Sequence, residues 1–150
     1  MNKLIAAVGL LSTVFTAASH AEPSHADKPM IAGLLHGMFD KAGETLVVEP
    51  VVVSGDHAIA DWTQGQMGGR ALLRRHQQAW TLILCAGDGI KSKEALGRAG
   101  VPGDDAQKLE AALLAEEARS PQERVAMFSR FEGMVRMDGQ DSHGDAAHHH

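Results

Sequence analysis

Residues 46–85 have the sequence LVVEPVVVSGDHAIADWTQGQMGGRALLRRHQQAWTLILC, and this stretch decides the fold. Apolar and β-branched residues dominate it, and clusters of turn-forming residues interrupt it, which is typical of short strands. We expect a glycine-rich loop over 65–69, and we expect Trp80, Leu82 and Leu84 to share one face of a strand. The predicted strands cover residues 46–53, 57–64, 70–75 and 80–85. Their tight connections favour an antiparallel meander.

Helical patterns flank this meander on both sides. Apolar residues recur at helical spacing before it, and Gly100, Pro102 and a Ser-Pro-Gln-Glu capping sequence punctuate the chain after it. The predicted helices cover residues 29–41, 92–99, 104–119 and 120–131. The sequence therefore predicts an α+β fold, with an N-terminal helix, a four-stranded antiparallel meander, and then C-terminal helices packing on one sheet face.

The N-terminus has the pattern of a cleavable secretory signal. Lys3 precedes an apolar run, and the small-x-small triplet Ser19-His20-Ala21 ends it. We therefore predict a signal peptide over 1–21 and no membrane anchor after cleavage. The predicted organisation of the remainder is a flexible leader over 22–28, a single α+β domain over 29–133, and a flexible Met/Asp/His-rich tail over 134–150.

Charge and cysteine content narrow the function classes. The chain has 14 basic and 19 acidic side chains, and this negative balance does not favour nucleic acid as a partner. Its one cysteine, Cys85, excludes a disulfide within the chain, and we expect it to be a buried strand residue that behaves as a small hydrophobe. The sequence contains no phosphate loop, dinucleotide fingerprint or HExxH motif, so we predict that the protein is not an enzyme.

The C-terminal segment combines soft and imidazole ligands with carboxylates, and histidine-rich tracts of this kind indicate metal binding. Thioethers favour Cu(I), whereas imidazole suits Cu(II), so copper in either oxidation state is the expected cofactor. The candidate metal ligands are Met134, Met137, Asp138, Asp141, His143, His148, His149 and His150, with Asp145 assisting. Two alternatives stay open: the terminal histidines are an affinity-tag remnant, or the two methionines are the last turn of the final helix.

Two further hypotheses come from other function classes. In the first, the curved sheet and its helices form a pocket for a small molecule or a protein, lined or rimmed by Trp62, Trp80, Arg70 and Arg74. In the second, Cys85 acts with His76 as a nucleophile, although no local motif supports such a pair. Full burial of Cys85 with no histidine in reach would remove that hypothesis.

Segments 51–62 (VVVSGDHAIADW) and 68–75 (GGRALLRR), with Trp80, Cys85 and Asp88, resemble the bacterial family called copper uptake system-associated proteins. The resemblance covers most of the chain after the signal. It implies a periplasmic location and a copper-binding accessory or chaperone role in copper uptake or delivery. The expected partners are a copper ion and another periplasmic copper chaperone or an outer-membrane copper receptor.

Overall fold

The computed structural model describes residues 25–139, and the predicted signal peptide lies outside them. A helix precedes a four-stranded hairpin series, and the elements of this first half are α1 (Asp27–Phe39), β1 (Leu46–Ser54), β2 (His57–Gln64), β3 (Met67–His76) and β4 (Ala79–Ala86). Short helices and one more strand follow, namely the 3₁₀ helix η1 (Asp88–Ile90), α2 (Lys93–Arg98), α3 (Gly103–Arg119), α4 (Gln122–Phe128) and β5 (Met134–Arg136).

The strands form one antiparallel sheet in the order β1-β2-β3-β4-β5. This confirms the predicted α+β class, with the N-terminal helix, the meander and the C-terminal helices in the expected order. The sheet has a fifth strand that the sequence did not predict. Residues Met134–Arg136 pair with Ala86, Cys85 and Leu84 of β4, so the start of the predicted flexible tail belongs to the sheet.

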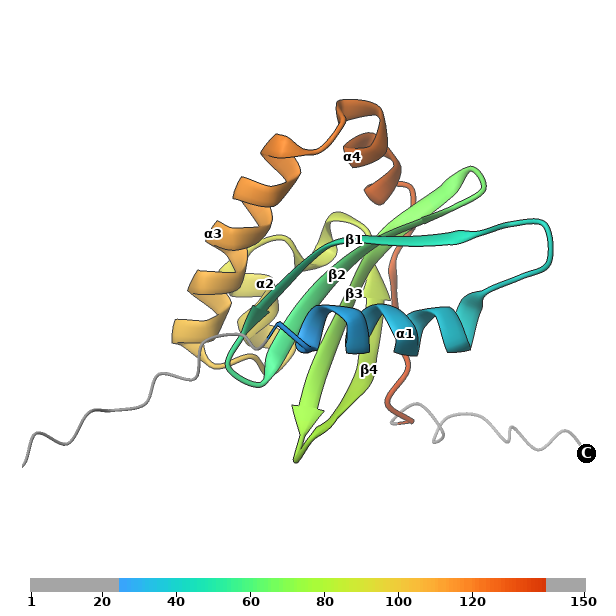
Figure 1. Ribbon diagram of the computed structural model, residues 1–150. Coiled ribbons are helices and arrows are strands. Elements are labelled where there is room, and N and C mark those ends of the chain that lie inside the picture. The colour runs from blue at the N-terminus through green and yellow to red at the C-terminus, as the bar shows by residue number, and fades with distance from the viewer. Residues whose placement is uncertain (1–24, 140–150) are drawn as a thin grey trace, which may run out of the picture.

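Both faces of the sheet are covered, which explains the near-continuous apolar runs of the strands. In Figure 1, α1 crosses one face of the sheet, and α2 and α3 lie on the other. The α1-side core contains Ile31 and Leu35 of α1 with Val51, Ala58, Ala60, Ala71, Leu73 and Leu82 of the sheet. The α3-side core contains Leu96, Leu109 and Leu113 with Val52, Ile59, Leu72 and Leu84. The fold is therefore a three-layer arrangement with two cores.

Two sequence-based expectations about the strands are wrong. Leu72 pairs with Leu84 whereas Leu73 pairs with Leu82, so Ile83 is an extra residue in β4 and turns Leu84 to the face opposite Leu82. The glycine-rich loop predicted over 65–69 is only a two-residue turn, because Gln64 already pairs with Met67. The third strand therefore starts earlier than predicted and includes both Gly68 and Gly69.

Candidate ligand pocket

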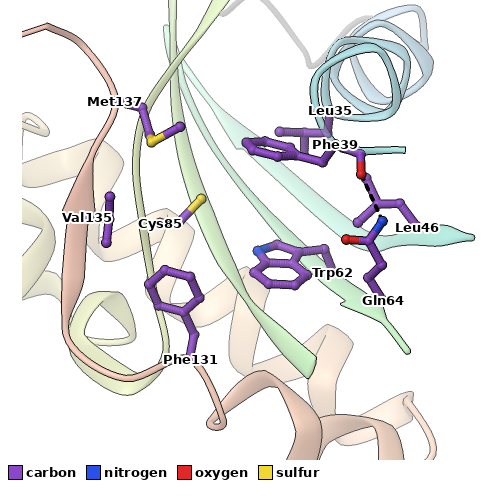
Figure 2. Close-up of a pocket in the computed structure, with 9 residues that line it drawn as sticks. All are labelled: Leu35, Phe39, Leu46, Trp62, Gln64, Cys85, Phe131, Val135 and Met137. Atoms are coloured by element: carbon purple, nitrogen blue, oxygen red, sulfur yellow. Dashed lines mark hydrogen bonds between the residues drawn. The ribbon is translucent and has the colours of Figure 1, made fainter. Parts of the chain in front are cut away.

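An apolar pocket of about 270 Å³ lies between α1, the sheet and the segment that leads into β5 (Figure 2). The helix contributes two side chains, the sheet four and the C-terminal segment three. They are Leu35, Phe39, Leu46, Trp62, Gln64, Cys85, Phe131, Val135 and Met137. Small-molecule sites in proteins are usually lined by apolar side chains together with a few polar groups.

Two glycines give the aromatic wall of this pocket its shape. Trp62 of β2 lies directly opposite Gly69 of β3, and its ring meets the Phe131 ring edge to face, with centroids 5.9 Å apart. A Cβ at Gly69 would lie 2.8 Å from Cζ2 of Trp62 and 2.9 Å from Cβ of Phe131. At Gly68 it would lie 2.6 Å from the carbonyl oxygen of Met127. Both glycines are thus needed for close packing.

Cys85 and Met137 bring two sulfur atoms to the same pocket, as Figure 2 shows. Cys85 is 7% exposed, as the sequence predicted for a buried strand residue, and burial raises the pKa of its thiol to about 11. The thiol is therefore protonated at neutral pH, whereas nucleophilic cysteines act as thiolates. No histidine lies among the residues of the described chain that line this pocket, and His76 instead lines a cavity on the other face of the sheet.

The polar groups of the pocket are few, and their hydrogen bonds differ. The Nε2 group of Gln64 donates to the carbonyl oxygens of Phe39 at 2.8 Å and of Glu44 at 3.2 Å, so both of its N–H groups are used. The Nε1–H group of Trp62 is buried and has no hydrogen-bond partner among residues 25–139. The wall of the pocket therefore contains one buried indole donor that is unsatisfied.

Only one of the four residues predicted to line or rim a pocket does so here. Trp62 lines it, but Trp80 is buried elsewhere, where its Nε1–H donates to Asp27. Arg70 is wholly buried in an ionic cluster, and Arg74 lines a cavity on the opposite face of the sheet. The predicted rim arginines are wrong for this pocket, because strand alternation places both on the face away from α1.

Some of the predicted copper ligands lie within the described residues, and the others lie outside them. Met134 and Met137 do not lie together: Met137 lines the apolar pocket, whereas the terminal methyl of Met134 lies beside Gly89 on the other face of the sheet. Asp138 forms an ion pair with Arg136 at 2.7 Å. Asp141, His143, Asp145, His148, His149 and His150 lie outside the described residues. Within 25–139, no three His, Cys, Asp or Glu side chains form a group that could hold a metal ion.

A second, more polar cavity of about 340 Å³ lies on the α3 side of the sheet, at the end where β2 begins. His57 and Arg74 are paired across β2 and β3 and line it together with His76, Arg136 and Asp138. Burial lowers the pKa of His57, with Asp105 opposing the shift, and its Nδ1 atom has no partner within the described chain. We therefore expect a neutral His57 at pH 7.

A buried ionic cluster joins the sheet to α3. The Nε group of Arg70 donates to Glu117 at 2.7 Å, and its Nη1 group donates to Asp88 at 3.1 Å. Asp61 lies opposite Arg70 in the sheet, with 3.8 Å between its Oδ1 atom and Nε of Arg70, and neither of its carboxyl oxygens accepts a hydrogen bond from a donor within the described chain. Burial raises the pKa of Asp61 to about 8, the charge of Glu117 adds to this, and Arg70 opposes it. Asp61 therefore carries a proton at neutral pH, and Arg70 pairs with Glu117.

Comparison of the chain with protein-family profiles, curated proteins and solved structures finds no match. The pocket and its geometry thus carry the functional argument. In the part of the chain from 25 to 139, no helix combines the length and the hydropathy that crossing a membrane requires.

Sequence reasoning found Trp62 as a pocket residue and missed most of its neighbours. Phe131, Val135 and Met137 come from a segment predicted to be the end of a helix and a tail, yet they form one wall of the pocket. The usable signal was the pair of glycines at the start of the third strand. In the meander Gly69 pairs with Trp62 and Gly68 with Thr63, and glycines at such positions indicate a large ring lying across the neighbouring strand.

Proposed function

We propose that this protein is a binding module that holds a small apolar molecule in the pocket between α1 and the sheet. The observation that carries this proposal is the set of apolar side chains around a space of about 270 Å³. An apolar cavity of roughly 150 Å³ is known to hold a benzene ring, so this one has room for about two such rings. It is too small for a folded segment of a protein partner.

Several contacts keep the pocket open before any ligand arrives. Phe39 is held to β2 by its hydrogen bond from Gln64, and the Trp62 and Phe131 rings brace each other at an interplanar angle of 80°. β5 pairs with β4, and the N–H group of Met137 then donates to the carbonyl oxygen of Ile83 at 2.7 Å, which fixes the third wall. A pre-formed pocket costs a ligand less conformational entropy on binding.

Adjacent residues of β5 provide a matched test. Val135 and Met134 are each 48% exposed, but only Val135 lines the pocket. The probe is 1-aminonaphthalene, a two-ring molecule whose fluorescence rises in apolar surroundings. We expect V135F to fill the pocket and weaken probe binding about tenfold or more, and M134F to leave it nearly unchanged. Equal affinities for the two variants, or no binding to the unsubstituted protein, would contradict the proposal.

A copper-binding accessory or chaperone role in the periplasm is the second candidate, and the concentration of histidines and aspartates after Gly139 favours it. Because 134–136 form a strand, the informative truncation removes only residues 140–150. We expect this truncation to lower the affinity for Cu(I) and Cu(II) in titrations, and to leave probe binding in the pocket intact. Unchanged copper affinity and stoichiometry would rule out the 140–150 ligands.

A further inference from the structure

We propose that the pocket selects an uncharged molecule with one hydrogen-bond acceptor, and that the indole N–H group of Trp62 binds this acceptor. This inference rests on the proposed binding function and specifies the ligand class of the same pocket. The acceptor would be a carbonyl, ether or hydroxyl oxygen attached to an apolar body.

Trp62 has an unused hydrogen-bond donor at the wall of the pocket. Buried N–H groups in proteins nearly always have a partner, and the indole nitrogen acts only as a donor. Trp80 follows this rule, because its Nε1–H donates to Asp27 at 3.2 Å. The Nε1–H group of Trp62 has no such partner among residues 25–139. In Figure 2 it lies on the side of the ring toward Cys85 and Met137. An acceptor on a bound ligand would satisfy it.

The described residues around this donor carry no charged side chain. None of the nine residues that line the pocket in the described chain is acidic or basic. A carboxylate or ammonium group would lose its hydration there without gaining a charged partner, which is strongly unfavourable. Gln64 already uses both amide N–H groups on backbone oxygens, so it adds no second donor. The pocket therefore favours a neutral ligand with a single strong acceptor.

The indole ring of Trp62 is packed on two sides. It lies so close over Gly69 that a Cβ atom there would clash with it, and it meets the Phe131 ring edge to face with centroids 5.9 Å apart. This packing limits rotation of the ring and holds the donor in place. A donor held in one direction distinguishes ligands by where their acceptor lies, because little side-chain entropy is lost on binding. The volume of about 270 Å³ limits the ligand to roughly ten to twelve non-hydrogen atoms.

The test compares two ligands of the same shape in two variants. Acetophenone carries a carbonyl oxygen where α-methylstyrene carries a methylene group, and each displaces 1-aminonaphthalene if it binds in the pocket. W62F keeps an aromatic ring and removes the donor. We expect W62F to weaken acetophenone binding about three- to tenfold more than α-methylstyrene binding. W80F, which removes the indole outside the pocket, should not change the ratio of the two affinities.

A second measurement reports on the N–H group directly. In ¹H–¹⁵N spectra, the two indole N–H signals are assigned from W80F, which has only one of them. Acetophenone should move the Trp62 proton signal further downfield than α-methylstyrene does. If W62F weakens both ligands equally and the signal does not distinguish them, the ring is only an apolar wall and this inference is wrong. If 1-aminonaphthalene binds the unsubstituted protein but neither ligand displaces it, this inference is wrong and the proposed binding function stands. If 1-aminonaphthalene itself does not bind, the proposed binding function fails.

Discussion

Gly69 is the residue on which the pocket wall depends most directly. The Cβ atom of an alanine there would approach both Trp62 and Phe131 to less than 3.0 Å, so the two rings must move. We expect G69A to lower the free energy of unfolding by about 1–3 kcal/mol and to weaken binding of 1-aminonaphthalene. Urea unfolding and probe titration measure the two effects.

The matched control for this substitution is G97A in α2. Gly97 has nothing within 4 Å of its Cβ position, and alanine favours a helix by about 0.5–1 kcal/mol over glycine. The control should therefore be neutral or stabilising, with probe affinity unchanged. Loss of probe binding in G97A, or normal binding in G69A, would contradict the role assigned to the close contact at Gly69.

Cys85 gives a second prediction at the scale of one residue. Its burial and its raised pKa of about 11 leave almost no thiolate at pH 8. We expect iodoacetamide to alkylate Cys85 far more slowly in the folded protein than in the protein unfolded in urea, at the same pH. Mass spectrometry of timed samples measures both rates. Comparable rates would mean that the thiol is accessible, and the hypothesis of a reactive cysteine would return.

At the scale of elements, β5 connects the pocket to the C-terminal segment. It is only three residues long, and it pairs with β4 through Leu84, Cys85 and Ala86. We expect truncation after Gly133 to abolish probe binding and lower the midpoint of thermal unfolding, because it removes Val135 and Met137 from the pocket wall. Truncation after Gly139 keeps this wall and should preserve both properties. If the truncation after Gly133 bound the probe better than the truncation after Gly139, β5 would be excluded as a pocket element.

The sequence predicted those elements that have their own periodic pattern. In most of the four long strands and the flanking helices, apolar residues repeat over eight or more positions. The predicted order of these elements is the observed one. The segment Met134–Arg136 is too short to show a periodic pattern of apolar residues. It forms a strand only because it pairs with the edge of β4. The extra residue at Ile83 was equally invisible, since a bulge depends on the partner strand.

The candidate site was less predictable than the fold for the same reason. The sequence indicated Trp62 as a pocket residue, but the pocket exists because Phe131 and Met137 return to the sheet from about 70 positions further along the chain. Arg70 resembled a rim residue because isolated arginines usually lie at the surface. Its burial depends on Glu117 and Asp88, which come from separate elements.

At the scale of the whole molecule, the Asp61–Arg70–Glu117 cluster joins β2, β3 and α3, and it gives the stability of the fold a pH dependence. The folded state raises the pKa of Asp61 to about 8, whereas the unfolded chain releases this proton near pH 4. Between these values the folded state binds more protons, so the free energy of unfolding falls as the pH rises, by at most about 1.4 kcal/mol per pH unit.

Substitution of Asp61 by asparagine isolates this effect, because the amide stays neutral at every pH. We expect D61N to be more stable than the unsubstituted protein at pH 8.5 and to lose that advantage as the pH approaches 5. Urea unfolding at constant ionic strength measures the free energy of unfolding of both proteins at each pH. His57 is present in both proteins, so its own titration cancels in the difference. If the free energy of unfolding of D61N depends on pH in the same way as that of the unsubstituted protein, Asp61 does not hold a proton in the folded state.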